Sequence, residues 1–157
     1  VAVGDVFRWF LLLTECERAF IALYDSNNDS LVTQVEHAWH EPEIQPIDQV
    51  VSDNLINKVI EIRDMFTSSN MDMASDSYQK SGSWRIPLRT VFGIPLMVGD
   101  ELIGIFYGDK KITSGIVQRD MMPLFKLYAA EAAIAIRNAI LFADIKQQIE
   151  SLTKTNP

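Results

Sequence analysis

The stretch IPLRTVFGIPLMVGDELIGIFYGDKK, residues 86–111, decides the fold of this chain. Apolar residues alternate over 88–98, and a period of two predicts a strand. Gly99-Asp100 follows as a two-residue hairpin turn, because glycine accepts the positive φ that such turns require. The run 102–107 is apolar almost throughout, which is expected of a strand covered on both faces, and Gly104 inside it marks a bulge or a close approach by another backbone. We expect this hairpin at the centre of an antiparallel sheet.

A second hairpin is predicted upstream. AFIALYD at 19–25 and LVTQVEHAW at 31–39 have strand composition, and SNNDS at 26–30 consists of residues that favour turns. Before this hairpin, the apolar residues of 1–15 lie near one helical stripe and predict a helix.

The connection between the two hairpins is mixed in character. HEPEIQPIDQ, 40–49, contains two prolines and is predicted to be a loop. Ser52 is expected to cap a helix that runs to about Ile62, because valine, leucine and isoleucine recur there at spacings of three and four. A short strand is predicted over 64–68. Residues 69–83 show no clear period and predict a long loop, or a loop that holds one short helix, and such loops are often functional.

The last predicted element is the longest. Asp120 is expected to cap a helix over about 121–152, with Pro123 in its first turn, and no further glycine or proline appears until Pro157. The second half of this helix carries apolar residues at coiled-coil spacing: Phe142, Ile145, Ile149 and Leu152.

Runs of paired strands with helices at both ends predict an α+β fold with a central antiparallel sheet. We expect a single domain over 1–157, in which 141–157 is a helix that leads out of the domain. The abrupt first residue and the open helix at the end are expected of a piece of a longer protein.

Composition excludes several classes of protein. The net charge of −7 and pI of about 4.7 give no electrostatic basis for binding nucleic acid or an anionic membrane. The single cysteine, Cys16, excludes an internal disulfide framework and suits a reducing compartment. We therefore expect a cytoplasmic domain.

Three phrases in order resemble a GAF domain: AFIALYD before an acidic turn, RTVFGIPLMVGDELIGIFYGDK, and AAEAAIAIRNAILFADI. The resemblance covers about 15–144. It implies a central antiparallel sheet flanked by helices, with the long N- and C-terminal helices on one side. It also implies the sensing of a small molecule within a signalling protein, often as a dimer.

The sequence departs from specialised members of this family. Asn57-Lys58 is followed by VIEIRD, so the NKFDE motif of cyclic-nucleotide-binding members is absent. Cys16 lies before the first strand, whereas bilin-binding members carry their cysteine later and members that reduce methionine sulfoxide carry cysteines in the pocket. The resemblance leaves the cofactor unknown.

The candidate ligand site is the concave side of the sheet, under the 69–83 loop. Aromatic walls with a few polar groups are typical of small-molecule pockets. The candidate walls are Trp39, Phe66, Tyr78, Trp84 and Phe92, and the candidate polar contacts are His40, Asp72 and Thr90. The alternative is that these aromatic residues are simply core.

Other candidate groups have plain alternatives. His37 and His40 are of a type that binds metal or haem, but two histidines near a strand end are more often surface residues. Cys16 is more often a small buried hydrophobe than a reactive thiol. The acidic residues of the 36–48 region are expected to form a solvated loop, and no catalytic motif is present.

Two functions are weighed. The first is a regulatory sensory domain that binds a small molecule and signals through its C-terminal helix to an output domain; the second is a ligand-free dimerisation or docking module, and an enzyme is the weakest option. In either case we predict a homodimer through the terminal helices, with an interface of Phe7, Phe10, Leu11, Phe142, Ile145, Ile149 and Leu152.

Overall fold

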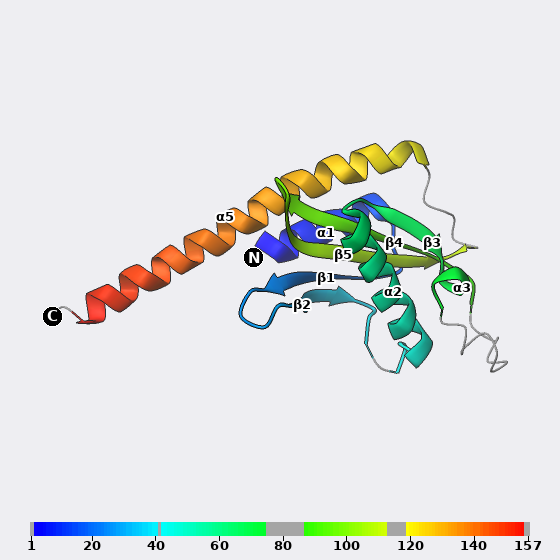
Figure 1. Cartoon of the computed structure of the whole chain (residues 1–157), viewed down its shortest axis with the longest axis horizontal. Coiled ribbons are helices and arrows are strands. Elements are labelled where there is room, and N and C mark those ends of the chain that lie inside the picture. The colour runs from blue at the N-terminus through cyan, green and yellow to red at the C-terminus, as the bar shows by residue number, and fades with distance from the viewer. Residues whose placement is uncertain (1, 41, 75–86, 113–118, 156–157) are drawn as a thin grey trace.

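The computed structural model describes residues 2–40, 42–74, 87–112 and 119–155. Within these ranges the sheet has five strands in the order β2-β1-β5-β4-β3, and every neighbouring pair is antiparallel (Figure 1). The predicted α+β fold with a central antiparallel sheet is confirmed, and β5 is its middle strand. The strands are Arg18–Asp25 (β1), Ser30–His37 (β2), Phe66–Ser69 (β3), Arg89–Val98 (β4) and Glu101–Lys111 (β5).

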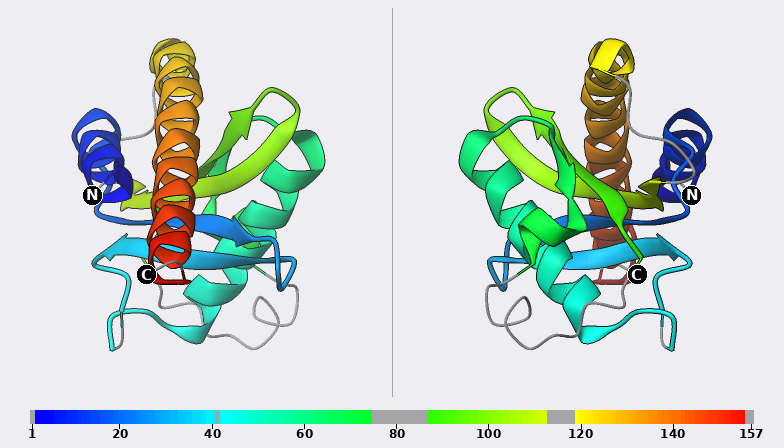
Figure 2. Two further views of the ribbon diagram at one scale, coloured as in Figure 1. Left: turned by 90° about the vertical axis from the view of Figure 1, so that its left-hand side faces the viewer. Right: turned by 90° about the vertical axis from the view of Figure 1, so that its right-hand side faces the viewer.

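Helices cover both faces of this sheet. One face packs against the two long terminal helices, and the other face packs against the helices between β2 and β4 (Figure 2). The expected placement of the terminal helices on one side is therefore confirmed. The helices are Ala2–Thr14 (α1), Pro46–Ile62 (α2), Asn70–Met73 (α3) and Met122–Thr155 (α5), with a 3₁₀ turn, Arg119–Met121 (η2), before the last.

The central strand β5 is buried on both faces, as its apolar run predicts. Phe106 packs in the cluster under α1 and α5, while Tyr107 and Ile105 pack under α2. A Cβ built on Gly104 would lie 2.5 Å from the carbonyl oxygen of Ala22, in the neighbouring β1. The structure shows both features predicted for this glycine, because the β4–β5 register also shifts beside it: Leu96 pairs with Gly104 and Met97 with Leu102.

The start of α2 differs from the prediction. The helix begins at Pro46 rather than after Ser52, because proline is well tolerated in a first helical turn, where its missing N–H has no helical partner. Asp48 lies in that turn and its Oδ2 accepts a hydrogen bond from the N–H of Gln45 at 2.9 Å. Ser52 is completely buried inside the helix, and its hydroxyl donates to the carbonyl oxygen of Gln49 at 3.0 Å. The prediction that Ser52 caps the helix is wrong.

The 69–83 segment begins with a short helix, α3, which agrees with the second of the two alternatives predicted for it, a loop that holds one short helix. Ser69 caps α3, and its Oγ accepts from the N–H of Asp72 at 3.1 Å. The remainder of the segment from residue 75 lies outside the described residues.

The C-terminal helix has two distinct halves. Its first half packs on the domain through small and apolar residues that end at Ile136, and ion pairs fix it to the body: Lys126 with Asp64 at 3.0 Å and Arg137 with Glu101 at 2.6 Å. Every residue from Leu141 to Thr155 is exposed, and Figure 1 shows this half extending past the sheet. In the described part of the chain, no helix is long and apolar enough to cross a membrane.

Candidate functional site

A hollow of about 340 Å³ lies beside Trp39, where the chain leaves β2 and enters α2. Its described lining residues are Trp39, His40, Ile44, Gln45, Pro46 and Gln49. The lining combines an aromatic ring and aliphatic carbons with two amides and an imidazole. This is the mixture of apolar walls and a few polar groups that is typical of small-molecule sites.

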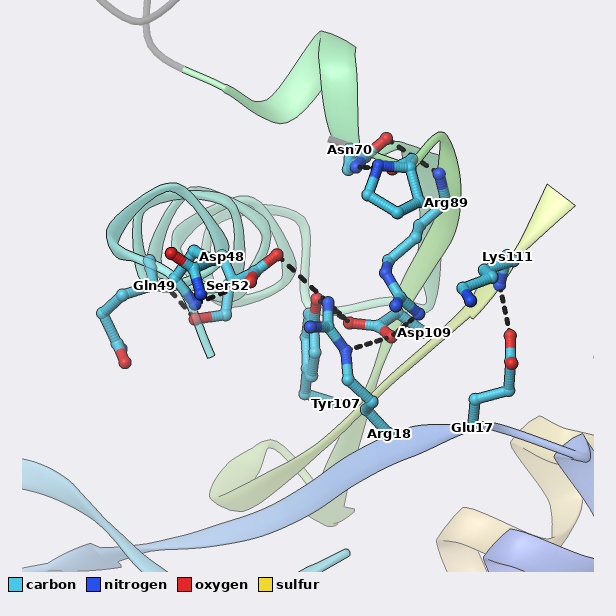
Figure 3. Close-up of polar contacts among 12 residues, drawn as sticks. Glu17, Arg18, Asp48, Gln49, Ser52, Asn70, Arg89, Tyr107, Asp109 and Lys111 are labelled. Atoms are coloured by element: carbon cyan, nitrogen blue, oxygen red, sulfur yellow. Dashed lines mark hydrogen bonds and ion pairs between the residues drawn. The ribbon is translucent and has the colours of Figure 1, made fainter. Parts of the chain in front are cut away.

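A buried ion-pair network lies next to the hollow, in contact with Trp39 of its lining. Figure 3 shows the side chains of this network. The guanidinium of Arg18 binds Asp109 through two parallel hydrogen bonds, Nε to Oδ1 and Nη2 to Oδ2, each 2.8 Å long. The same guanidinium lies over the ring of Trp39, at 5.2 Å from the ring centroid. The indole that borders the hollow is therefore in direct contact with the network.

The network joins four elements of the fold. Arg18 on β1 also donates from Nη2 to Asp48 of α2 at 3.1 Å, and Arg89 on β4 donates from Nη1 to Asp109 at 3.3 Å. The hydroxyl of Tyr107, on β5, donates to Oδ2 of Asp109 at 2.9 Å. Two cations and two carboxylates thus balance in charge, which is the condition under which buried ions are tolerated.

The environment keeps these groups in their usual protonation states. Burial alone would lower the pKa of Arg18, but its hydrogen bonds to Asp109 and Asp48 outweigh that effect and raise the pKa. Burial, followed by the nearby carboxylate of Asp109, raises the pKa of Tyr107 well above its ordinary value. Arg18 therefore stays charged and Tyr107 stays a hydrogen-bond donor.

The first turn of α2 belongs to both features. Gln45, Pro46 and Gln49 line the hollow, while Asp48 of the same turn binds Arg18. A molecule that displaced this turn would also strain the Asp48–Arg18 contact. The arrangement can therefore couple the occupancy of the hollow to the middle of the sheet.

The structure brings together only part of the predicted ligand site. Trp39 and His40 border the hollow, and Phe66 packs with the same core cluster as Trp39. Phe92 lies in the cluster under α1 and α5, and Thr90, two residues away on the same strand, shares that face. These two residues are therefore separated from Trp39 by the sheet. Asp72 is exposed on α3 and does not line the hollow, and Tyr78 and Trp84 lie outside the described residues.

The remaining candidate groups are placed as follows. His37 and His40 are both exposed, and no cluster of three or more metal-binding side chains occurs among the described residues. Cys16 is buried beside Gly108, and burial raises the pKa of its thiol to about 12. Cys16 is therefore a small buried hydrophobic residue, which is the alternative to a reactive thiol given in the sequence analysis.

The predicted dimer residues differ in their exposure, and Leu11 among them is half-buried against the core of its own chain. Phe7 and Phe10 are buried within the domain, where Phe10 stacks on Phe106 with ring centroids 4.4 Å apart. They offer no surface to a second chain, because the sheet of their own chain already covers them. The exposed large apolar residues of α1 are instead Trp9 and Leu12. The four predicted residues of α5 are all exposed: Phe142, Ile145, Ile149 and Leu152.

Sequence reasoning missed the network entirely. Arg18 begins the strand RAFIALYD, and Asp109 ends the apolar run IGIFYGD, so each is a charged residue at the edge of a buried strand. A charge in such a position needs a partner, and opposite signs on two strands are the signal that could have indicated the pair.

Comparison with known proteins supports the fold. No protein-family model matches the sequence, and no curated protein matches it. The GAF domain of a two-component sensor histidine kinase from Bacillus halodurans superposes with a TM-score of 0.64 at 16% identity, covering 90% of this chain and 95% of that one. A GAF domain/HD domain protein from Geobacter sulfurreducens superposes with a TM-score of 0.64 at 12% identity, covering 89% and 92%.

The second GAF domain of DevS from Mycobacterium smegmatis is similar to the same degree. It superposes with a TM-score of 0.62 at 17% identity, covering 91% of this chain and 99% of that one. The chain therefore has a GAF-like fold, as the sequence resemblance implied.

Proposed function

We propose that this chain is a regulatory sensory domain of a cytoplasmic signal-transduction protein, which binds a small molecule in the hollow beside Trp39. The observation that carries the proposal is the joint use of the first turn of α2: the turn lines the hollow and also binds Arg18 through Asp48. The fold adds support, since solved domains with this fold come from a sensor histidine kinase and a methyl-accepting chemotaxis protein.

The bound state would be passed on through α5 to an output domain. The first half of α5 contacts β4, and its second half leaves the domain as an exposed helix. A rigid helix shared by the domain and the segment beyond it can hold two discrete arrangements. We propose further that two copies pair through this helix, and that the domain binds rather than catalyses.

A ligand screen tests the proposal. Thermal unfolding of the purified chain would be measured against nucleotides, amino acids and small organic acids; a ligand at about 100 times its dissociation constant adds about 2.7 kcal/mol to the stability. The stabilisation should shrink in Gln49→Ala, because Gln49 lines the hollow from an exposed position. The matched control is Gln34→Ala, an exposed glutamine on β2. A binder that stabilises both variants equally would place the ligand elsewhere.

A second candidate is a ligand-free dimerisation or docking module. It is favoured by the aromatic side chains that fill the space between the sheet and α2. There Phe20, Trp39 and Tyr107 pack with ring centroids 5.0 to 5.2 Å apart. This reading expects no stabilisation by any member of the panel while the chain still pairs in solution. One specific binder that depends on Gln49 would exclude it.

A further inference from the structure

A second cavity, of about 150 Å³, lies at the edge of the sheet between the turn after α2 and the first half of α5. The short strand β3 leaves room for it: β3 begins at Phe66, opposite Gly93, so the rest of β4 has no strand on that side. Pro95 lines the cavity from this part of β4 and suits an unpaired edge, because proline has no N–H to donate to a neighbouring strand. The cavity therefore follows from the topology of the sheet.

The walls of this cavity are largely apolar. Met65, Ile94 and Ala129 line it and are buried. Ala129 and Ala130 of α5 leave the space open, because their side chains end at Cβ. A cavity of this size holds a molecule as large as benzene, with about six carbon atoms. The cavity can therefore take the body of a small apolar molecule.

Charged groups at the same cavity leave a surplus of positive charge. Lys126 of α5 binds Asp64 at 3.0 Å, and the hydrogen bond from Lys126 lowers the pKa of the Asp64 carboxyl, which stays ionised. Arg63 lines the cavity too, and within the described part of the chain no carboxylate pairs with it. Two cations against one carboxylate leave a net charge of +1, of which the C-terminal end of α2 offsets about half a charge. The cavity therefore attracts an anion, although the whole chain carries −7.

The backbone at Arg63 is unusual for an arginine. Its φ of 55° and ψ of 36° are left-handed, and its N–H donates to the carbonyl oxygen of Val59 at 2.8 Å, where α2 ends. Glycine is the usual residue at such a helix end, because it has no Cβ to clash. Arginine at this position costs stability relative to glycine, but it places a cation beside the cavity. The charge can therefore be removed by substitution with glycine without harm to the fold.

We propose that this cavity is a second binding site, which takes a small organic carboxylate. The anionic head lies at Arg63 and Lys126, where charge-assisted hydrogen bonds are available. The aliphatic body lies against Met65, Ile94 and Ala129.

This site is separate from the hollow of the proposed function. The helix α2 has 17 residues and is about 26 Å long, with Gln49 of the hollow near its start and Arg63 at its end. A carboxylate between Arg63 and Lys126 joins the turn after α2 to α5, as the Lys126–Asp64 pair already does. The bound anion therefore favours the arrangement in which the first half of α5 stays on the sheet.

A titration of the purified chain with butyrate and with isovalerate tests the site. A ligand of about six non-hydrogen atoms is expected to bind with a dissociation constant on the order of millimolar, a range that ¹H–¹⁵N NMR can follow. The expected result is saturable shifts of the backbone amides of Met65 and Ala130. Butyramide, which has the same shape without the charge, and sodium chloride at equal ionic strength are the controls, and neither should reproduce these shifts.

Two variants locate the binding. Arg63→Gly should weaken butyrate binding about tenfold or more, because it removes a charged hydrogen-bond donor. Its thermal midpoint should stay the same or rise, since glycine relieves the left-handed backbone. Ala130→Leu should abolish binding by filling the cavity. The matched control is Ala135→Leu, the same change at an exposed position of α5 that does not line the cavity.

Two results would overturn the proposal. The first is the absence of saturable shifts with either carboxylate, or equal shifts with butyramide. The second is unchanged butyrate affinity in Arg63→Gly or in Ala130→Leu. Shifts that vanish in Gln49→Ala but persist in Arg63→Gly would place the carboxylate in the hollow beside Trp39, which would support the proposed function and exclude this second site.

Discussion

Replacing Asp109 by asparagine should destabilise the fold severely, because this carboxylate holds the buried network together. It accepts two hydrogen bonds from Arg18, one from Arg89 and one from Tyr107, and it is completely buried. Asparagine offers one oxygen in place of two and turns an N–H toward a donor, so that the Arg18 charge loses its main partner. Breaking a buried ion pair from one side costs about 3–5 kcal/mol.

Urea unfolding followed by circular dichroism measures this loss, and the thermal midpoint should fall on the order of 10 °C. The matched control is Asp53→Asn, the same chemical change in α2 at an exposed carboxylate that accepts a hydrogen bond from the side-chain amide of Gln49 at 3.2 Å. Its free energy of unfolding should stay within about 0.5 kcal/mol of the unmutated chain.

A double variant separates the loss of the pair from the cost of an orphaned charge. Arg18→Met with Asp109→Leu removes this ion pair, but it also takes from Asp48, Arg89 and the Tyr107 hydroxyl their partners in the network, so only part of the lost stability should return. A loss of less than about 1 kcal/mol in Asp109→Asn would refute the reasoning, because it would mean that Arg18 finds another partner or water at no cost.

Three further outcomes are expected. Ile145→Asp should weaken the pairing of two copies several-fold in sedimentation, because it puts a carboxylate among the exposed apolar side chains Phe142, Ile149 and Leu152. The thiol of Cys16 should resist iodoacetamide in the folded chain at pH 8, because burial raises its pKa from 9.0 to about 12. The contribution of this thiol to the free energy of unfolding is therefore complete below pH 9.0 and is lost as the pH rises through about 12. Gly104→Ala should cost about 2 kcal/mol or more in chemical unfolding, because the added methyl would lie 2.5 Å from the carbonyl oxygen of Ala22, whereas Gly4→Ala in α1 meets nothing within 4 Å and should be neutral or slightly stabilising.

Local sequence patterns predict the helices and strands of the fold, but they do not predict which faces of these elements pack against one another. The alternation of β4 correctly puts Thr90 and Phe92 on one side of the strand, but a period of two cannot say which helix covers that side. The same limit applies to α1. Its apolar stripe predicts that Phe10 is buried, and only the tertiary structure shows that the burial is against Phe106 of the same chain.

The candidate site was predicted in part for a related reason. Trp39 and His40 stand out as aromatic and polar residues beside a proline-rich connection, and both border the hollow. The Arg18–Asp109 pair joins residues separated by 91 positions, so no local pattern connects them. The start of α2 was missed because Pro46 is equally compatible with a loop and with a first helical turn.

The exposed second half of α5 can convert a small rotation at the domain into a larger displacement at the tip of the helix. The helix still contacts the body at Arg137, through its ion pair with Glu101, and continues to Thr155 as a projecting arm of about 27 Å at 1.5 Å per residue. A rotation of about 5° at the last point of contact would therefore move the tip by roughly 2.5 Å. A rotation too small to open the core around Ala132 and Ile136 would therefore displace the tip of the helix by about as much as a shift of half a helical turn.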